Sequence, residues 1–121
     1  MRKYLALLMA VVMTVCLAGC GTDQSEATAP SRSEFRVGAI YITGRDDTAG
    51  YTYAHHRGIV TAMENLGLDT EHQLFIEDNI PEERQQVLDA IDRLVSEGVH
   101  IIFGISFGYM DPMEEAAEKY P

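Results

Sequence analysis

From residue 35 onward, short apolar runs alternate with longer segments in which apolar residues recur at helical spacing. The runs at residues 35–43, 72–77 and 99–105 are rich in β-branched and aromatic side chains. The first and third are nearly continuous in apolar character, as is typical of strands buried on both faces of a parallel sheet. We therefore predict three strands.

Helical spacing marks the segments that follow these strands. Gly67 and Gly98 stand directly after the first two helical segments, where a helix C-terminus favours glycine. A third helix is predicted to begin at Asp111 as N-cap, with Pro112 at the first helical position. The predicted inner faces of the three helices are Ile59, Ala62, Met63 and Leu66; Val87, Leu88, Ile91, Leu94 and Val95; and Met113, Ala116, Ala117 and Tyr120.

The alternating order of strands and helices predicts an α/β fold, with a parallel sheet between two helical layers in a three-layer α/β/α arrangement. Ligands of such sheets gather at the carboxyl ends of the strands. Here those ends are the loops at residues 44–50, 78–81 and 105–111. Three parallel strands leave an unpaired sheet edge, so we expect the domain to continue in a longer chain.

The first twenty residues predict export and lipid attachment. Arg2 and Lys3 precede an apolar run at residues 4–17, and Leu-Ala-Gly-Cys occupies residues 17–20. This order is that of a secretory signal peptide, and its end resembles the bacterial lipobox, in which Cys20 is diacylated. A membrane-spanning helix is disfavoured because it needs about 20 apolar residues. We predict a signal peptide at residues 1–19 and a lipid-anchored protein on the extracytoplasmic face of the cell membrane.

Composition sharpens this organisation. Residues 20–34 are predicted to form the lipidated cysteine and a disordered tether, since no large apolar side chain occurs in them, and residues 35–121 to form the folded domain. Removal of residues 1–19 leaves seven basic against nineteen acidic side chains, a net charge of −12. Such a surface argues against nucleic acid as a partner and against binding anionic lipid by charge. With Cys20 acylated, no thiol remains for a disulfide or a cysteine-based metal site.

Three loop sequences are distinctive. Residues 50–56 read Gly-Tyr-Thr-Tyr-Ala-His-His, residues 77–82 read Glu-Asp-Asn-Ile-Pro-Glu, and residues 106–112 read Ser-Phe-Gly-Tyr-Met-Asp-Pro. They resemble the Gly-aromatic-Thr-Tyr-Ala-His, Glu-x-Asn-x-Pro-Glu and Ser-Phe-Gly-aromatic-Met-Asp-Pro stretches of BMP-family lipoproteins. These are the basic-membrane-protein or PnrA-like solute-binding proteins of bacteria.

The resemblance extends over residues 35–121 and implies a type I periplasmic-binding fold, in which two α/β lobes close around a ligand. This chain would then contain part of the first lobe. The resemblance further implies capture of purine nucleosides or nucleobases and their delivery to an ABC permease, with no catalysis and no cofactor.

The ligand-binding residues that we predict lie after the first and third predicted strands, in or beside these stretches: Asp47, Tyr51, Tyr53, His55, Ser106 and Phe107. Tyr51 or Tyr53 can stack on a flat purine for ~1–3 kcal/mol per base. Asp47 can accept hydrogen bonds from ribose hydroxyls or an exocyclic amine. The family aspartate stands two residues before the glycine and Asp47 stands three before Gly50, which leaves Asp46 as an alternative. For Tyr53 and Phe107 the alternative role is packing beneath the loops.

Alternative functions rest on single features of the sequence. A sugar-binding or ligand-sensing lipoprotein of the same fold would use the same loops. A serine hydrolase is suggested by residues 104–108, which fit G-x-S-x-G around Ser106, but no histidine follows in the chain. A phospho-accepting receiver domain is suggested by Asp46 and Asp47, but such a domain also needs an aspartate at the end of the third strand, where this chain has Ile105 and Ser106. A metal site at His55 and His56 is disfavoured because adjacent helical side chains point apart.

Overall fold

A computed structural model describes residues 29–121. The predicted signal peptide, Cys20 and the first part of the predicted tether lie outside the described residues. The chain forms β1 (Val37–Tyr41), α2 (Tyr51–Asn65), β2 (Leu74–Glu77), α3 (Arg84–Ser96), β3 (Ile101–Ile105), a 3-10 turn (Phe107–Tyr109) and α4 (Met110–Lys119). Within this part of the chain, no helix is both long enough and apolar enough to cross a membrane.

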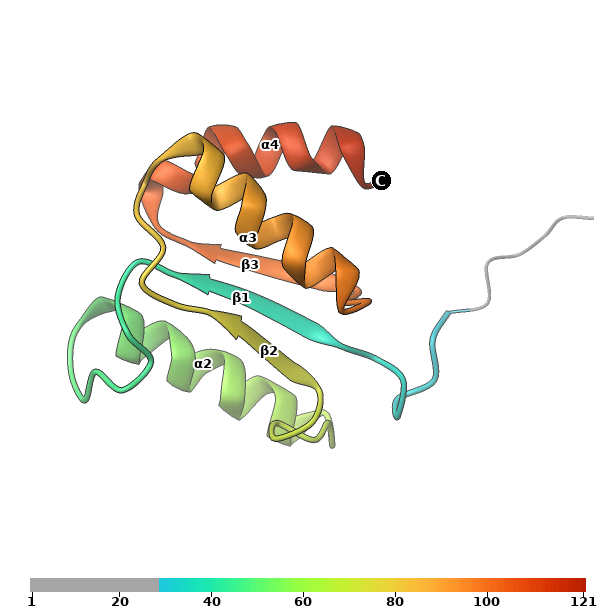
Figure 1. Cartoon of the computed structure of the whole chain (residues 1–121). Coiled ribbons are helices and arrows are strands. Elements are labelled where there is room, and N and C mark those ends of the chain that lie inside the picture. Colours follow the sequence, from blue (N-terminus) through green and yellow to red (C-terminus); the bar gives the residue numbers. More distant parts are fainter. Residues whose placement is uncertain (1–28) are drawn as a thin grey trace, which may run out of the picture.

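The three strands form one parallel sheet in the order β2-β1-β3. Helix α2 covers one face of the sheet, and α3 and α4 cover the other (Figure 1). The predicted α/β class, with its parallel sheet between helical layers, is therefore confirmed. All three strands point the same way, so the loops that follow them meet at one edge of the sheet (Figure 1).

The centre of the fold is β1, whose five residues are all buried. Helix α3 packs against it through Val87, Ile91 and Leu94, as its apolar spacing predicts, and also through Ala90, whereas the predicted Leu88 and Val95 are half-buried. Gly38 permits this close approach, because a Cβ there would lie 3.1 Å from Leu94 Cδ1 and 3.2 Å from Ile102 Cγ1. The core therefore lies mainly between β1 and α3.

The predicted C-terminal ends of α2, α3, β2 and β3 agree with the structure, whereas all three strands begin later than predicted. Gly67 and Gly98 follow α2 and α3 with φ values of +70° and +73°, a conformation that favours glycine. All three strands are shorter than predicted, so that His72 and His100 precede β2 and β3 instead of lying within them. His72 instead lies in a turn, where its Nδ1 is 2.8 Å from Asp69 Oδ2.

The prediction that β3 is buried on both faces is wrong for its α2 side. Ile101 and Phe103 are 41% and 39% exposed. An apolar groove of about 410 Å³ lies between them and the α2 residues Ile59 and Met63. The burial expected of β3 fails because α2 leaves this face of the strand partly open.

The prediction that Asp111 caps the last helix is also wrong. The 3-10 turn runs directly into α4, which begins at Met110 and places Asp111 in the first turn, with Tyr109 at the N-cap. Pro112 is accommodated because backbone N–H groups of a first turn have no partner within the helix. On the predicted inner face, Ala116 is buried and Met113 half-buried, whereas Ala117 and Tyr120 are exposed.

Candidate functional site

The connection between β2 and α3 links all three loops at the carboxyl edge of the sheet. After β2 it passes over the end of β1, where the Ile80 amide donates to the Tyr41 carbonyl at 3.0 Å. It then reaches the segment after β3, where the buried Tyr109 hydroxyl donates to the Ile80 carbonyl. The predicted grouping of the loops at 44–50, 78–81 and 105–111 is thus realised in the structure.

An ion pair joins the first two loops. Arg45 Nε lies 2.8 Å from Asp78 Oδ2, and the same guanidinium donates to the Ile76 carbonyl at 3.1 Å. The hydrogen bond from Arg45 is the main cause of the lowered pKa of Asp78. Neither residue was among the predicted site residues. The ion pair could have been predicted from their opposite charges, since each residue stands near the start of a loop and the two loops follow neighbouring strands.

A carboxylate joins the second and third loops. Glu82 Oε1 accepts a hydrogen bond from the Ser106 hydroxyl and another, at 2.9 Å, from the Gly108 amide. These two bonds hold the pKa of Glu82 below its usual range, the Ser106 bond contributing more. Glu82 belongs to the distinctive stretch at residues 77–82, but the sequence gives no sign of its role. Its hydrogen-bond partners lie more than twenty residues away in the chain.

We expect the contribution of Glu82 to stability to depend on pH. Because its pKa is lowered in the folded state, the ionised group stabilises the fold above its ordinary pKa of 4.5, and this contribution is lost as the pH falls through the lowered value. The difference in free energy of unfolding between the unmodified protein and Glu82→Gln should therefore be constant near neutral pH and shrink below about pH 4.5. Denaturant titrations at a series of pH values measure it. A difference that grows on acidification would contradict this assignment.

The predicted residues of α2 fall on two sides of the helix. Tyr51 and His55 are one turn apart, with ring centroids 4.2 Å apart and His55 Nδ1 at 2.8 Å from the Tyr51 carbonyl oxygen. Tyr51 is 56% exposed. Tyr53, which is 37% exposed, lies two residues further along and so faces another direction from Tyr51. The structure thus brings Tyr51 and His55 together and separates Tyr53 from them.

The remaining predicted residues lie in the first and third loops. The Asp47 carboxylate is held by the Thr43 hydroxyl at 3.1 Å, in the loop between β1 and α2. Ser106 directly follows β3 and is bonded to Glu82, as described above. Phe107 is 84% exposed, which excludes the alternative that it packs beneath its loop.

The two adjacent histidines point apart, as predicted. In contrast to His55, His56 is half-buried, and its Nδ1 lies 3.1 Å from the hydroxyl of the fully buried Tyr41. Burial is the main cause of the lowered pKa of His56, and burial raises the pKa of Tyr41 to about 12. Among residues 29–121, no three His, Cys, Asp or Glu side chains are grouped so as to hold a metal ion.

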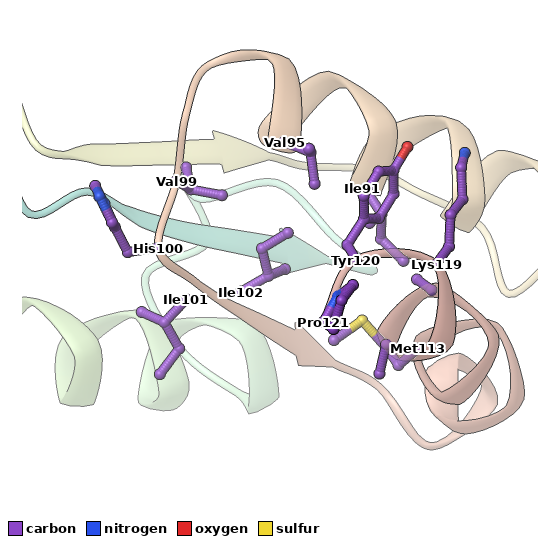
Figure 2. A pocket seen from close by; sticks show the side chains of 12 residues that line it. Ile91, Val95, Val99, His100, Ile101, Ile102, Met113, Lys119, Tyr120 and Pro121 are labelled. Atoms are coloured by element: carbon purple, nitrogen blue, oxygen red, sulfur yellow. The ribbon is translucent and has the colours of Figure 1, made fainter. Parts of the chain in front are cut away.

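Among residues 29–121, two apolar grooves lie away from these loops. The larger, of about 550 Å³, is formed by α3, α4 and β3, with Ile91, Ile102 and Met113 among its lining residues (Figure 2). The smaller lies between α2 and β3, as described above. None of the six predicted ligand residues lines either groove. The candidate site is therefore an open edge, formed by exposed aromatic and polar side chains of three linked loops.

Comparison with known proteins gives a similarity that bears on function. No protein-family model matches the chain. The chain is 37% identical over 93 residues to a purine-binding protein of Brucella abortus (strain 2308). The aligned region covers 77% of this chain and 25% of the relative. The chain thus spans about a quarter of the length of the curated relative that it matches.

Proposed function

We propose that this chain forms part of the first lobe of a BMP-type solute-binding protein that captures purine nucleosides or nucleobases and delivers them to an ABC permease. The observation that carries the proposal is the 37% identity to a purine-binding protein over most of this chain. The three loop sequences quoted above support the same assignment. A binding role without catalysis is part of the proposal.

The chemistry of the open edge suits a purine. Tyr51 and Phe107 present exposed aromatic rings, on which a flat base can stack for ~1–3 kcal/mol. Asp47 and His55 offer polar groups to the base edge or the sugar. Small-molecule sites bury most of the ligand surface, so the proposal requires a second wall that faces this edge when the ligand is bound. That wall is expected from the second lobe.

The location of the protein is also part of the proposal. We infer that Cys20 carries the lipid that anchors the domain to the extracytoplasmic face of the cell membrane, since it directly follows the signal-peptide-like segment at residues 1–19. An intact mass of the protein extracted from native membranes tests this. A diacylated N-terminal Cys20 would support the anchor, and a retained Met1 without lipid would contradict it.

The acidic pair of the first loop gives a direct test of the site. Asp47→Asn in the complete native polypeptide should weaken adenosine binding about tenfold, because a hydrogen bond to a charged acceptor is worth more than one to a neutral amide. Asp46→Asn is the matched control and should change affinity less than about twofold. Binding of labelled adenosine, with guanosine and ribose as competitors, measures both. If Asp46→Asn loses more adenosine affinity than Asp47→Asn, Asp46 is the residue that contacts the ligand. Displacement of labelled adenosine by ribose but not by guanosine would favour the sugar-binding alternative.

A further inference from the structure

Glu82 forms the polar link between the β2–α3 connection and the turn after β3. A single carboxylate oxygen, Oε1, accepts both the Ser106 hydroxyl proton and the Gly108 amide proton. The two donors lie on either side of Phe107. The residues before and after this exposed aromatic side chain are therefore both held by one carboxylate from another loop.

The packing around Gly108 is a second observation that points to the same link. A Cβ at this position would lie 2.5 Å from Glu82 Cδ and 2.8 Å from Glu82 Cβ. Both distances are too short for real contacts, and the second involves an atom close to the Glu82 backbone. Only glycine leaves room for the Glu82 side chain to lie against the turn.

The turn has a further attachment that fixes its other end. Tyr109 is 1% exposed and donates its hydroxyl proton to the Ile80 carbonyl, in the same β2–α3 connection as Glu82. Phe107 lies between these attachments, and its side chain is 84% exposed, in contrast to the buried Tyr109. Its position is therefore determined by the residues that hold its backbone and not by packing of its ring.

We propose that Glu82 is the positioning residue of the purine site: its carboxylate fixes the turn at residues 106–108 and thereby holds the Phe107 ring where the base stacks. This inference rests on the proposed function. It also assigns Ser106 a role different from direct ligand contact, because the hydroxyl proton of Ser106 is donated to Glu82. Ser106 then acts through Glu82 and the turn.

A double-mutant cycle on adenosine affinity, in the complete native polypeptide, tests this assignment. Glu82→Ala should weaken binding about tenfold, as expected for loss of hydrogen bonds to a charged acceptor. Ser106→Ala added to Glu82→Ala should weaken it by less than about a further twofold, because the two residues act as one unit. If the fold-loss of adenosine affinity in the double variant equals the product of the losses in the two single variants, the proposal is overturned, since Ser106 would then contact the ligand by itself.

Conservative and neighbouring substitutions separate positioning from general destabilisation. Glu82→Gln keeps an oxygen that can accept both hydrogen bonds and should restore affinity to within about threefold of the unmodified protein. Glu83→Ala removes an adjacent carboxylate that does not contact the turn and should change affinity less than about twofold.

Gly108→Ala should weaken binding as Glu82→Ala does, whereas Gly58→Ala, with nothing within 4 Å of the added Cβ, should not. Equal losses in Glu82→Gln and Glu82→Ala would overturn the proposal.

Hydrogen exchange of the Gly108 amide provides a readout that needs no ligand. Loss of its acceptor in Glu82→Ala should speed this exchange about tenfold or more, with smaller changes elsewhere in the sheet. Unchanged exchange would overturn the positioning role. If the unmodified polypeptide binds no purine, the proposed function fails and with it the ligand role of Glu82, while faster Gly108 exchange would still support its hold on the turn.

Discussion

Leu94→Ala is expected to lower the free energy of unfolding by about 2–5 kcal/mol, the usual cost of truncating a buried leucine. Leu94 is 2% exposed and lies on the face of α3 that packs against β1. Its Cδ1 would lie 3.1 Å from a Cβ on Gly38, so the Leu94 side chain occupies the space that this glycine leaves beside β1. Urea unfolding followed by circular dichroism measures the change.

Leu66→Ala is the matched control for this substitution. Leu66 stands at the C-terminal end of α2 and is 62% exposed, so the same truncation removes little buried surface. Its effect should stay within about 0.5 kcal/mol. A loss at Leu94 no larger than the loss at Leu66 would contradict the placement of the core between α3 and β1.

Phe107→Ala is expected to weaken purine binding by about 10- to 100-fold in the complete native polypeptide, as judged from the value of one stacked base, ~1–3 kcal/mol. Because Phe107 is 84% exposed, the substitution should leave the free energy of unfolding nearly unchanged. Equilibrium binding of adenosine and urea unfolding of the same variant measure the two quantities separately.

Two further variants make the stacking role specific. Phe107→Tyr keeps an aromatic face and should retain affinity to within about threefold. Leu66→Ala removes another exposed apolar side chain, at the C-terminal end of α2 and away from the three loops, and should leave affinity unchanged. An unchanged affinity in Phe107→Ala, or a loss in Phe107→Tyr as large as in Phe107→Ala, would contradict stacking on this ring.

The fold was largely predictable because its main signals are local. Helical spacing in residues 87–95 indicates the face that becomes buried, and Gly67 and Gly98 mark helix ends through a backbone conformation that favours glycine. The starts of the strands were less predictable. The run at residues 99–105 is already apolar before β3 begins at Ile101, and its composition does not show where pairing starts. The start of α4 was missed because a 3-10 turn already supplies the first turn that Asp111 would have capped.

The candidate site was predictable only at the level of loops. Parallel strands place their following loops at one edge. Asp47, Ser106 and Phe107 lie in these loops and Tyr51 and His55 in the first turns of α2, whereas Tyr53 faces another direction from Tyr51. The contacts that shape the edge, Arg45 with Asp78 and Glu82 with Ser106, join residues far apart in sequence. Spacing rules do not reach such pairs, because they depend on the strand order β2-β1-β3 and on the path of the chain over β1. The sequence alone therefore suggested Ser106 as a ligand residue, and the structure shows it bonded to Glu82.

Calorimetric titration of the complete native polypeptide with adenosine, guanosine and adenine, with ribose as the comparison, tests purine capture most directly. We expect saturable binding of at least one purine at a single site, with no detectable binding of ribose alone. Saturable ribose binding, or the absence of heat with both purine nucleosides and with adenine, would contradict it.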